Sequence, residues 1–356
     1  MKKTTDHIRK KLKRKELKRH ILKISKLFKV LIIGILMIFI GVVVYMVKPE
    51  LFPFNKKLAR EWQPKDVETE MSLGFLPQEI QYGYQLLSET QKYLGPQADD
   101  PQMQISGNNL SCTSCHLQAG NQAGAASWAG VTTRYPTFRG RSNAIGTIED
   151  RINGCLERSM NGKKLDVESR PMKAMVAYME WLGEDMPKEK RDYYTGFTDL
   201  KIPDVAVDLE YGKRVYVKEC MVCHQEDGQG VKKADFSLGY EFPPVWGEDT
   251  YNDGAGMHRV LTAAAFIKAN MPFEEATKEN PKLSDEEAFH VAGYINSLAR
   301  PAKSNLENDF PDRKLKPVST PYGPWDDDFS AEQHKYGPFP PIIAYYKEKY
   351  DMEKTN

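Results

Sequence analysis

CTSCH, at residues 112–116, is the stretch around which the rest of this 356-residue chain is organised. A Cys-x-x-Cys-His run is the attachment motif of a c-type haem, because the two thiols add to the vinyl groups of the porphyrin and the adjacent imidazole ligates the iron. The pattern recurs as CMVCH at residues 220–224, so four of the five cysteines fall into two copies of it. We therefore expect two covalently bound haem c groups, held by Cys112, Cys115 and His116 and by Cys220, Cys223 and His224.

A structural zinc site or a dithiol redox centre is the alternative use of two Cys-x-x-Cys pairs. The pairs lie about a hundred residues apart, far outside the spacing of zinc ribbons. A histidine also follows each pair directly. Both observations favour haem attachment.

Charge is divided unevenly along the chain. The formal net charge is +1, but residues 1–29 hold 13 Lys or Arg against 2 Asp or Glu, which leaves 37 basic and 47 acidic residues for the remainder. An acidic body argues against a nucleic-acid partner. The composition is otherwise that of an ordinary globular protein, with 40% hydrophobic and 28% charged residues, and the length predicts two or three units.

An uninterrupted apolar run, VLIIGILMIFIGVVVYMV, fills residues 30–47 and has the length of a transmembrane helix. A cleaved signal peptide is the competing interpretation, but the run is longer than a usual signal-peptide core and no small-x-small cleavage site follows it. The excess of Lys and Arg before the run places the N-terminus in the cytoplasm. We expect a single-pass cell-membrane protein with its haem domains outside, on the periplasmic or outer face, where the resemblance to haem c proteins implies that the haem is attached.

The second half of the chain repeats the order of the first. The first half begins with a predicted helix at 78–94, where apolar residues recur at helical spacing, and continues with the haem motif at 112–116. A segment of proline and aromatic residues follows at 135–141, and a final predicted helix lies at 171–182. The same order recurs at 205–219, 220–224, 243–247 and 285–300, with a further helix at 258–272. Repetition of the whole order, and not of the motif alone, indicates two units of about 100 residues.

This order resembles that of a class I cytochrome c domain. The fold expected is all-α, with two class I cytochrome c domains in tandem preceded by one transmembrane helix, and with haem completing two small cores. The segments expected are a basic cytoplasmic arm (1–29), a transmembrane anchor (30–47), a stalk (48–75), a first cytochrome domain (76–186), a linker (187–204), a second cytochrome domain (205–300) and an extended tail rich in proline and aromatic residues (301–356).

The residue at the sixth position of each iron sets the chemistry of that haem. For the second haem, Met271 lies 47 residues after His224 and precedes a proline, as the distal ligand of this fold commonly does. Core packing is its alternative role, and Lys268 could replace it as a nitrogen ligand. For the first haem the corresponding position falls near Met160, five residues after Cys155, and both residues remain candidates.

Cys155 is the only cysteine outside the two haem motifs. If residues 151–160 are helical, their spacing places a thiol, two guanidinium groups and a hydroxyl on one face, from Cys155, Arg151, Arg158 and Ser159. Arginines lower the pKa of a nearby thiol and bind anions through paired N–H groups. Pairing with haem propionates or a solvated face is the alternative for these arginines and for Arg139 and Arg141.

A set of segments extends the likeness beyond the haem motifs: SCTSCH, RYPTFRGR, DRINGCLERSMNG, FIKANMP, and KPVSTPYGPW with EQHKYGPF in the tail. On this set the chain resembles the dihaem thiosulfate dehydrogenase family over nearly all of residues 75–345. The resemblance implies that the first haem is the active site with axial ligands His116 and Cys155, and that the second is an electron-transfer centre with His224 and Met271. Members of the family are typically soluble and periplasmic, so the apolar span departs from the pattern.

The activity that the resemblance implies is the joining of two thiosulfate dianions into tetrathionate, or the reverse reaction. Electrons would pass from the first haem through the second to an external acceptor, such as another cytochrome c or a membrane redox complex. Thiolate ligation lowers the potential of a haem and methionine ligation raises it, so this direction is downhill. We expect Cys155 to be catalytic, and the two dianions to be bound by Arg141, Arg151, Arg158, Ser159 and Lys163.

Two other functions stay open. A dihaem electron carrier without its own substrate would need two methionine-type haems and no Cys155. A dihaem peroxidase would keep one iron accessible to peroxide. Cys155 and its neighbouring arginines favour the sulfur oxidoreductase.

Overall fold

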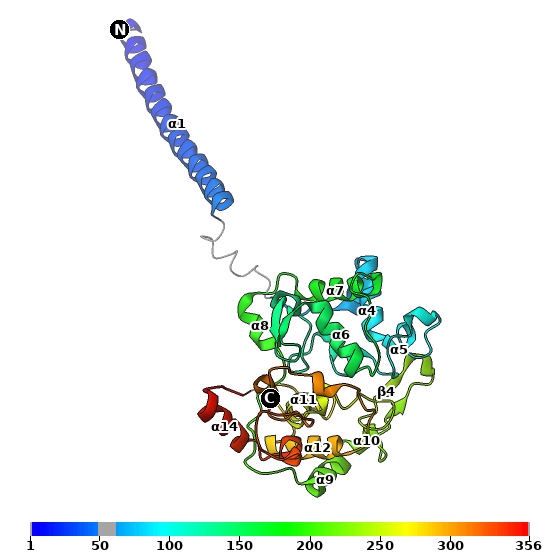
Figure 1. Ribbon diagram of the computed structural model, residues 1–356. Helices are drawn as coiled ribbons and strands as arrows, with labels where there is room; N and C mark the ends of the chain where they lie inside the picture. Colours follow the sequence, from blue (N-terminus) through cyan, green and yellow to red (C-terminus); the bar gives the residue numbers. More distant parts are fainter. Residues whose placement is uncertain (1, 49–61, 355–356) are drawn as a thin grey trace. The chain divides into compact units, whose positions relative to one another are not determined.

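The computed structural model describes residues 2–48 and 62–354. The chain divides into two compact units, Met1–Trp62 and Gln63–Asn356. Residues 49–61, nearly half of the predicted stalk at 48–75, lie outside the described residues. In the described part of the first unit the chain forms one long helix, α1 (Lys2–Val47) (Figure 1).

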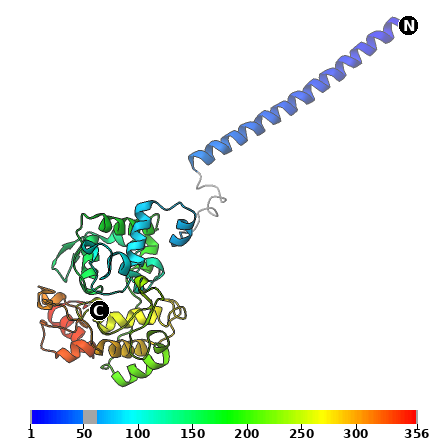
Figure 2. The ribbon, with the colours of Figure 1, turned by 90° about the vertical axis from the view of Figure 1, so that its right-hand side faces the viewer.

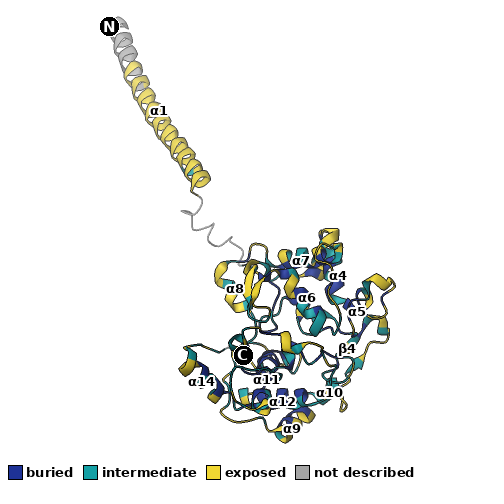
Figure 3. Ribbon diagram, viewed as in Figure 1, coloured by how far each residue is buried: buried dark blue, intermediate teal, exposed yellow. Residues whose placement is uncertain are grey.

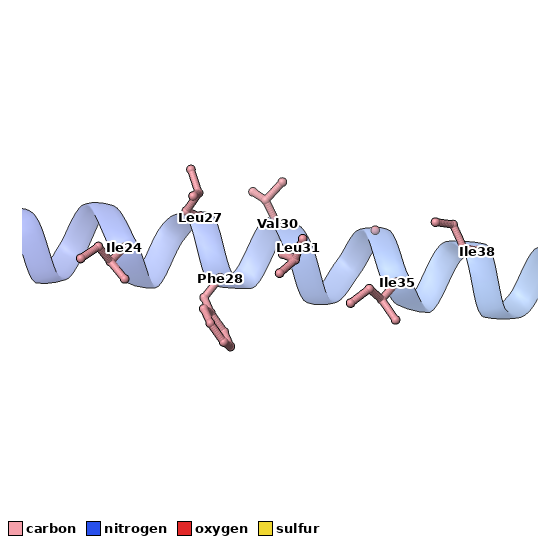
Figure 4. A pocket seen from close by; sticks show the side chains of 8 residues that line it. Ile24, Leu27, Phe28, Val30, Leu31, Ile35 and Ile38 are labelled. Carbon is pink, nitrogen blue, oxygen red and sulfur yellow. The ribbon is translucent and has the colours of Figure 1, made fainter.

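Helix α1 includes one stretch, Leu17–Val47, that is long and apolar enough to cross a membrane. Its side chains are exposed on all sides: Leu27 and Val30 project from one side of the helix and Phe28 from the other (Figure 4). Leu27 is 78% exposed and Val30 is 70% exposed. A helix that is apolar around its whole circumference is typical of a segment surrounded by apolar material, as in a bilayer.

The second unit is built on two crossed helix pairs. Helix α4 (Gln78–Ser88) packs on α7 (Arg170–Gly183), and α9 (Leu209–Glu219) packs on α12 (Asp285–Ser297), which also contacts α11 (Val260–Asn270). Figures 1 and 2 show that the unit has two halves, residues 63–200 and residues 205–350, which lie side by side. The pair α4 and α7 lies in the first half, and the pair α9 and α12 lies in the second half. The mostly helical architecture predicted from the sequence is confirmed.

Both crossings depend on a glycine. A Cβ atom on Gly83 would overlap the carbonyl of Ala174 and would touch Tyr178 in α7, and a Cβ on Gly212 would overlap the carbonyl of His290 in α12. At each crossing the two backbones therefore approach more closely than any side chain allows. Because Gly83 and Gly212 hold the same place in the two halves, the sequence repeat is also a repeat of packing.

Short elements complete the unit. The helices are α3 (Val67–Ser72), α5 (Thr90–Tyr93), α6 (Ile148–Arg158), α8 (Lys188–Tyr194), α10 (Met221–His224), α13 (Ala331–Tyr336) and α14 (Pro340–Tyr350). Two antiparallel hairpins pair β1 (Thr137–Arg139) with β2 (Ala144–Gly146) and β3 (Val231–Lys232) with β4 (Tyr240–Phe242). In the first hairpin Phe138 lies opposite Ile145.

Two apolar cores fill the unit, one in each half (Figure 3). The first includes Leu86, Leu156 and Tyr178, and the second includes Tyr216 and Phe289, all at most 1% exposed. Side chains of the tail belong to the second core, namely Val318, Phe339, Ile342 and Tyr346. The tail is therefore a structural part of the second half.

Three sequence predictions need correction. The tail is not extended throughout, because residues 340–350 form the 11-residue helix α14. The stalk does not reach residue 75, because Val67 is 3% exposed and belongs to the first core. The helix predicted at 78–94 breaks at Glu89, where the backbone leaves helical geometry between α4 and α5.

Candidate functional site

The two histidines of the haem motifs are held in the same way. Nδ1 of His116 hydrogen-bonds to the carbonyl oxygen of Ala126 at 2.8 Å, and Nδ1 of His224 hydrogen-bonds to the carbonyl oxygen of Pro243 at 2.8 Å. A ligating histidine is commonly oriented by such a bond from its other ring nitrogen. In both sites Nε2 is therefore left to bind iron.

A cavity of about 550 Å³ adjoins the first motif and is lined by Cys112, Cys115 and His116. Its apolar wall comes from the first core and includes Leu87, Trp128, Met175 and Met179. Thiols for attachment, an oriented imidazole and an apolar wall are the groups that a covalently bound haem needs. The residues present thus fit haem c at this place.

Helix α6 brings Cys155 into this cavity. Thr147 and Asp150 form a reciprocal capping box that starts the helix, and Ile152 and Leu156 bury one face in the first core. The adjoining face carries the four residues that the sequence grouped together, and all four line the cavity: Arg151, Cys155, Arg158 and Ser159. Met160, the other candidate for the distal position, lines the same cavity and is 3% exposed.

Cys155 and His116, the two predicted axial ligands of the first haem, line the same cavity, and His116 is close enough to lower the pKa of the Cys155 thiol. Nη1 of Arg151 donates a hydrogen bond to Sγ of Cys155 at 2.8 Å. Burial by itself raises the pKa of this thiol, but Arg151, His116 and Arg139 outweigh burial and lower the pKa to about 6. The protein therefore stabilises Cys155 as a thiolate, which is the form that ligates metal.

Arg141 and Arg158 do not face the cavity as free cations. Nη1 of Arg141 donates to Oδ2 of Asp309 at 2.5 Å, and Nη2 of Arg158 donates to Oδ1 at 2.8 Å. Burial tends to raise the pKa of Asp309, but Arg141 and then Arg158 outweigh it, and the pKa falls below its usual value. The Tyr322 hydroxyl also bonds to Asp309, at 2.7 Å. One carboxylate of the tail, that of Asp309, thus offsets one of the two positive charges of Arg141 and Arg158.

Three further arginines line the cavity, although the sequence did not predict them to bind substrate: Arg134, Arg139 and Arg259. Burial lowers the pKa of each, and neighbouring arginines lower it further in every case. For Arg259 the pKa falls to about 10, with repulsion from Arg141 and Arg151. Lys163, by contrast, is exposed and is not among the residues that line the cavity.

The end of α6 is tied to the second half of the unit. Asn252 donates from its backbone N–H to the carbonyl oxygen of Arg158 at 3.1 Å and from its side chain to that of Glu157 at 2.9 Å. Asn108 bonds both to the carbonyl oxygen of Ser159, at 3.0 Å, and to that of Thr250, at 3.1 Å. These bonds fix the helix that carries Cys155.

Met271 directly follows α11 and packs, partly buried, against the second core, as do Cys220 and Trp246. The preceding residue, Asn270, is 1% exposed and accepts a hydrogen bond from Gln122 of the first half at 2.7 Å. Lys268 instead bonds to Asp285 at 2.7 Å and to the carbonyl oxygen of Asp199 at 3.1 Å. Lys268 is therefore held away from a ligand's role in this structure.

Comparison with known proteins matches both halves to cytochrome families. Residues 102–187 match the SoxA/TsdA cytochrome c domain, and residues 209–299 match cytochrome c. The matches imply haem c in this chain.

Curated relatives extend the likeness over most of the second unit. The chain is 43% identical over 205 residues to a thiosulfate dehydrogenase of Psychrobacter arcticus, covering 58% of this chain and 61% of that protein. It is 37% identical over 232 residues to the thiosulfate dehydrogenase of Allochromatium vinosum, covering 64% of this chain and 80% of that protein. For Stutzerimonas stutzeri the values are 37% identity over 227 residues, 64% of this chain and 69% of the relative.

A solved structure shares the fold. The thiosulfate dehydrogenase (TsdBA) from Marichromatium purpuratum, in its as-isolated form, is 30% identical, with a TM-score of 0.59. The similarity covers 70% of this chain and 51% of the solved chain. The chain thus spans about half of that protein and less than two thirds of the Psychrobacter relative.

Proposed function

The chain belongs to the thiosulfate dehydrogenase family, and from this we propose that it is a membrane-anchored dihaem oxidoreductase that joins two thiosulfate dianions into tetrathionate. The reaction is 2 S₂O₃²⁻ → S₄O₆²⁻ + 2 e⁻. One sulfur–sulfur bond forms between the two terminal sulfur atoms, no proton is consumed, and the two electrons leave for an external acceptor. Reduction of tetrathionate is the same chemistry in reverse.

The observation that carries this proposal is the environment of Cys155. Its thiolate lies close to His116 and accepts a hydrogen bond from Arg151. A plain electron carrier has no use for a stabilised thiolate with an adjacent guanidinium group. A sulfur oxidoreductase uses both, because a thiolate is a nucleophile toward sulfur and a guanidinium binds a sulfonate through two N–H groups.

The charge of the cavity suits two dianions. Six arginines line it, and no Asp or Glu is among the described residues that do. Asp309, behind Arg141 and Arg158, and the Cys155 thiolate offset two of the six charges. The surplus of positive charge lowers the repulsion between two anions that must bring their terminal sulfur atoms into contact. Arg151 and Ser159 are the groups closest in sequence to Cys155 for this role.

Haem c, when bound at each motif, supplies a one-electron acceptor. The residues of the chain set the difference between the two sites: Cys155 and Arg151 at the first, Met271 at the second. Thiolate ligation favours the lower potential and methionine ligation the higher one. Electrons would leave the first site for the second, and pass from there to another cytochrome c or to a membrane redox complex.

The apolar helix α1 supports membrane attachment. Residues 30–47 lie within the stretch that is long and apolar enough to cross a bilayer, and the 13 basic residues before position 30 favour a cytoplasmic N-terminus. The haem domains would then lie on the periplasmic or outer face of the cell membrane.

Turnover of the detergent-solubilised haem protein tests this proposal. Oxidised protein is mixed with thiosulfate and an artificial one-electron acceptor, and tetrathionate is quantified; we expect one tetrathionate for every two electrons accepted. The reverse direction is assayed with tetrathionate and pre-reduced protein. If neither direction proceeds, the chain is an electron carrier, and if peroxide oxidises the reduced protein catalytically, it is a peroxidase; either result overturns the proposal.

A further inference from the structure

Arg259 reaches the first haem's cavity from the second cytochrome domain. It precedes α11 as the N-cap residue and lines the cavity with Thr262, one turn further along the helix. Ten of the eleven residues of α11 are buried, so the start of this helix is fixed by the second core. The guanidinium of Arg259 is therefore presented by a rigid element and not by a loop.

Arg259 differs from Arg141, Arg151 and Arg158 in its partners. Arg151 has the Cys155 thiolate, and Arg141 and Arg158 share the carboxylate of Asp309. For Arg259 the described residues offer one weak bond, from Nε to the carbonyl oxygen of Gly256 at 3.4 Å, and no carboxylate within ion-pair distance. Arg259 is partly buried, and a guanidinium that is withdrawn from water without gaining a counter-charge is destabilised.

Arg259 lines the same cavity as Arg141, Arg151 and Cys155, so an anion bound there could contact these three arginines. Arg141 and Arg151 are the two charged groups that repel it most, and Arg151 is the residue that donates to Sγ of Cys155. An anion placed between Arg151 and Arg259 would relieve this repulsion. The sulfonate oxygens of thiosulfate carry part of its negative charge and accept hydrogen bonds from such paired N–H groups.

We propose that Arg259 binds the sulfonate of a thiosulfate dianion at the first haem, so that the second cytochrome domain completes the substrate site. This inference rests on the proposed function. It also gives α11 two roles, because the helix begins at the substrate cavity with Arg259 and ends next to Met271. Eleven helical residues span about 16 Å, so one rigid helix joins the substrate site to the distal side of the second haem.

Three variants of the full-length haem protein test the proposal. Arg259→Gln removes the charge, Arg259→Lys keeps it without the paired donors, and Arg214→Gln removes an exposed arginine of the same domain as a matched control. We expect Arg259→Gln to raise the KM for thiosulfate roughly 10- to 100-fold, the usual effect of losing one hydrogen bond to a charged group. Arg259→Lys should recover part of the loss, and Arg214→Gln should stay within about twofold of the wild type, as an exposed charge does.

A binding measurement without turnover accompanies the kinetics. Calorimetric titration of thiosulfate into Cys155→Ala protein, with and without Arg259→Gln, gives the dissociation constant directly, and we expect a similar 10- to 100-fold weakening. A redox titration of both haems shows whether Arg259 serves a haem propionate instead. A shifted potential of the first haem with unchanged thiosulfate affinity would overturn the inference.

The remaining outcomes separate the two levels of the proposal. If the wild type forms tetrathionate and Arg259→Gln binds thiosulfate as well as the wild type does, the role of Arg259 is wrong and the proposed function stands. If the wild type neither forms nor consumes tetrathionate, the proposed function is wrong, and the role of Arg259 falls with it.

Discussion

The two cytochrome domains share one arrangement of crossed helices and haem-motif histidine, which we call the frame, and they differ in one helix. Each has a glycine at the crossing of its first and last helices, Gly83 and Gly212, and each fixes its haem-motif histidine through a backbone carbonyl. The two domains differ in the helix that carries or precedes the predicted distal ligand. In the first domain α6 turns a polar face toward the haem cavity, whereas in the second domain α11 is almost wholly buried and apolar.

Under the proposed function, this difference would let one fold serve both substrate chemistry and electron transfer. The frame provides attachment and a proximal ligand, which both sites need. In the proposed assignment the distal helix would decide whether the iron meets the Cys155 thiolate among arginines or the Met271 thioether beside an apolar core. The cavity at the first motif is lined by six arginines, which suits a site that receives anions.

The largest effect on activity should follow from replacing the predicted distal ligand of each haem with alanine. We expect Cys155→Ala to lower the rate of tetrathionate formation at least about 100-fold, because it removes a group on which the chemistry depends. Met271→Ala is the matched variant of the other domain. It should lower the potential of the second haem and slow electron delivery, while thiosulfate still reduces the first haem.

These variants are read by EPR of the oxidised proteins and by steady-state kinetics. A thiolate-type low-spin signal should be lost in Cys155→Ala and kept in Met271→Ala. Full turnover in Cys155→Ala would remove the distinction between the two sites.

The next largest effect concerns the tail. Asp309→Asn leaves Arg141 and Arg158 without their shared anion, and we expect a loss of about 3 kcal/mol in the free energy of unfolding, as for a broken buried ion pair. Chemical denaturation measures it. The pKa of Asp309 is lowered on folding, so its stabilisation is full above the usual value of 3.8 and disappears as the pH falls through the lower folded value.

The pH dependence provides the control for this prediction. Wild type and Asp309→Asn should differ most near neutral pH and converge in acid. A difference that stays constant from pH 7 to pH 3 would mean that the carboxylate charge is not what stabilises the two arginines.

A smaller effect is expected at Arg151. Arg151→Gln removes the charged donor to Sγ of Cys155, which should cost about 1.5–3 kcal/mol, or roughly 10- to 100-fold in kcat/KM for thiosulfate. The exposed Arg170, which pairs with Glu79 on the surface, offers the control variant Arg170→Gln. Equal kinetics of the two variants would argue against a role for Arg151 beside the thiolate.

The smallest effects should be shared by the two domains. Gly83→Ala and Gly212→Ala each force two packed helices apart, and we expect a loss of about 1–3 kcal/mol for each. Thermal unfolding measures both. Gly74→Ala is not a suitable control because its φ is +72°, whereas Gly34→Ala has no neighbour within 4 Å and should change little. A large loss in one domain only would break the equivalence of the two frames.

Local sequence was sufficient to predict the frame. The haem motifs and the helical spacing of apolar residues in α4 and α7 act over a few residues, so they can be recognised without a structure. The group on α6 followed from helical spacing in the same way. The helix α14 could also have been found, because Pro340 and Pro341 at its start are a common beginning of a helix.

Tertiary packing decided the rest of the site. Asp309 reaches Arg158 across 151 positions of the sequence, and Arg259 reaches the first cavity from the other domain. No pattern in the neighbouring sequence predicts a contact between residues that are so far apart in the chain. The structure was therefore required to separate the two cavity arginines that share Asp309 from Arg259, which has no carboxylate partner among the described residues.

The most direct test is an anaerobic single-turnover experiment on the oxidised protein without added acceptor. Thiosulfate is mixed with wild type and with Cys155→Ala, and ferrous haem absorption is followed while tetrathionate is quantified. We predict that the wild type takes up two electrons and releases one tetrathionate per molecule, and that Cys155→Ala releases none. Equal tetrathionate from both proteins, or haem reduction without tetrathionate in the wild type, would contradict the assignment of substrate chemistry to the first haem.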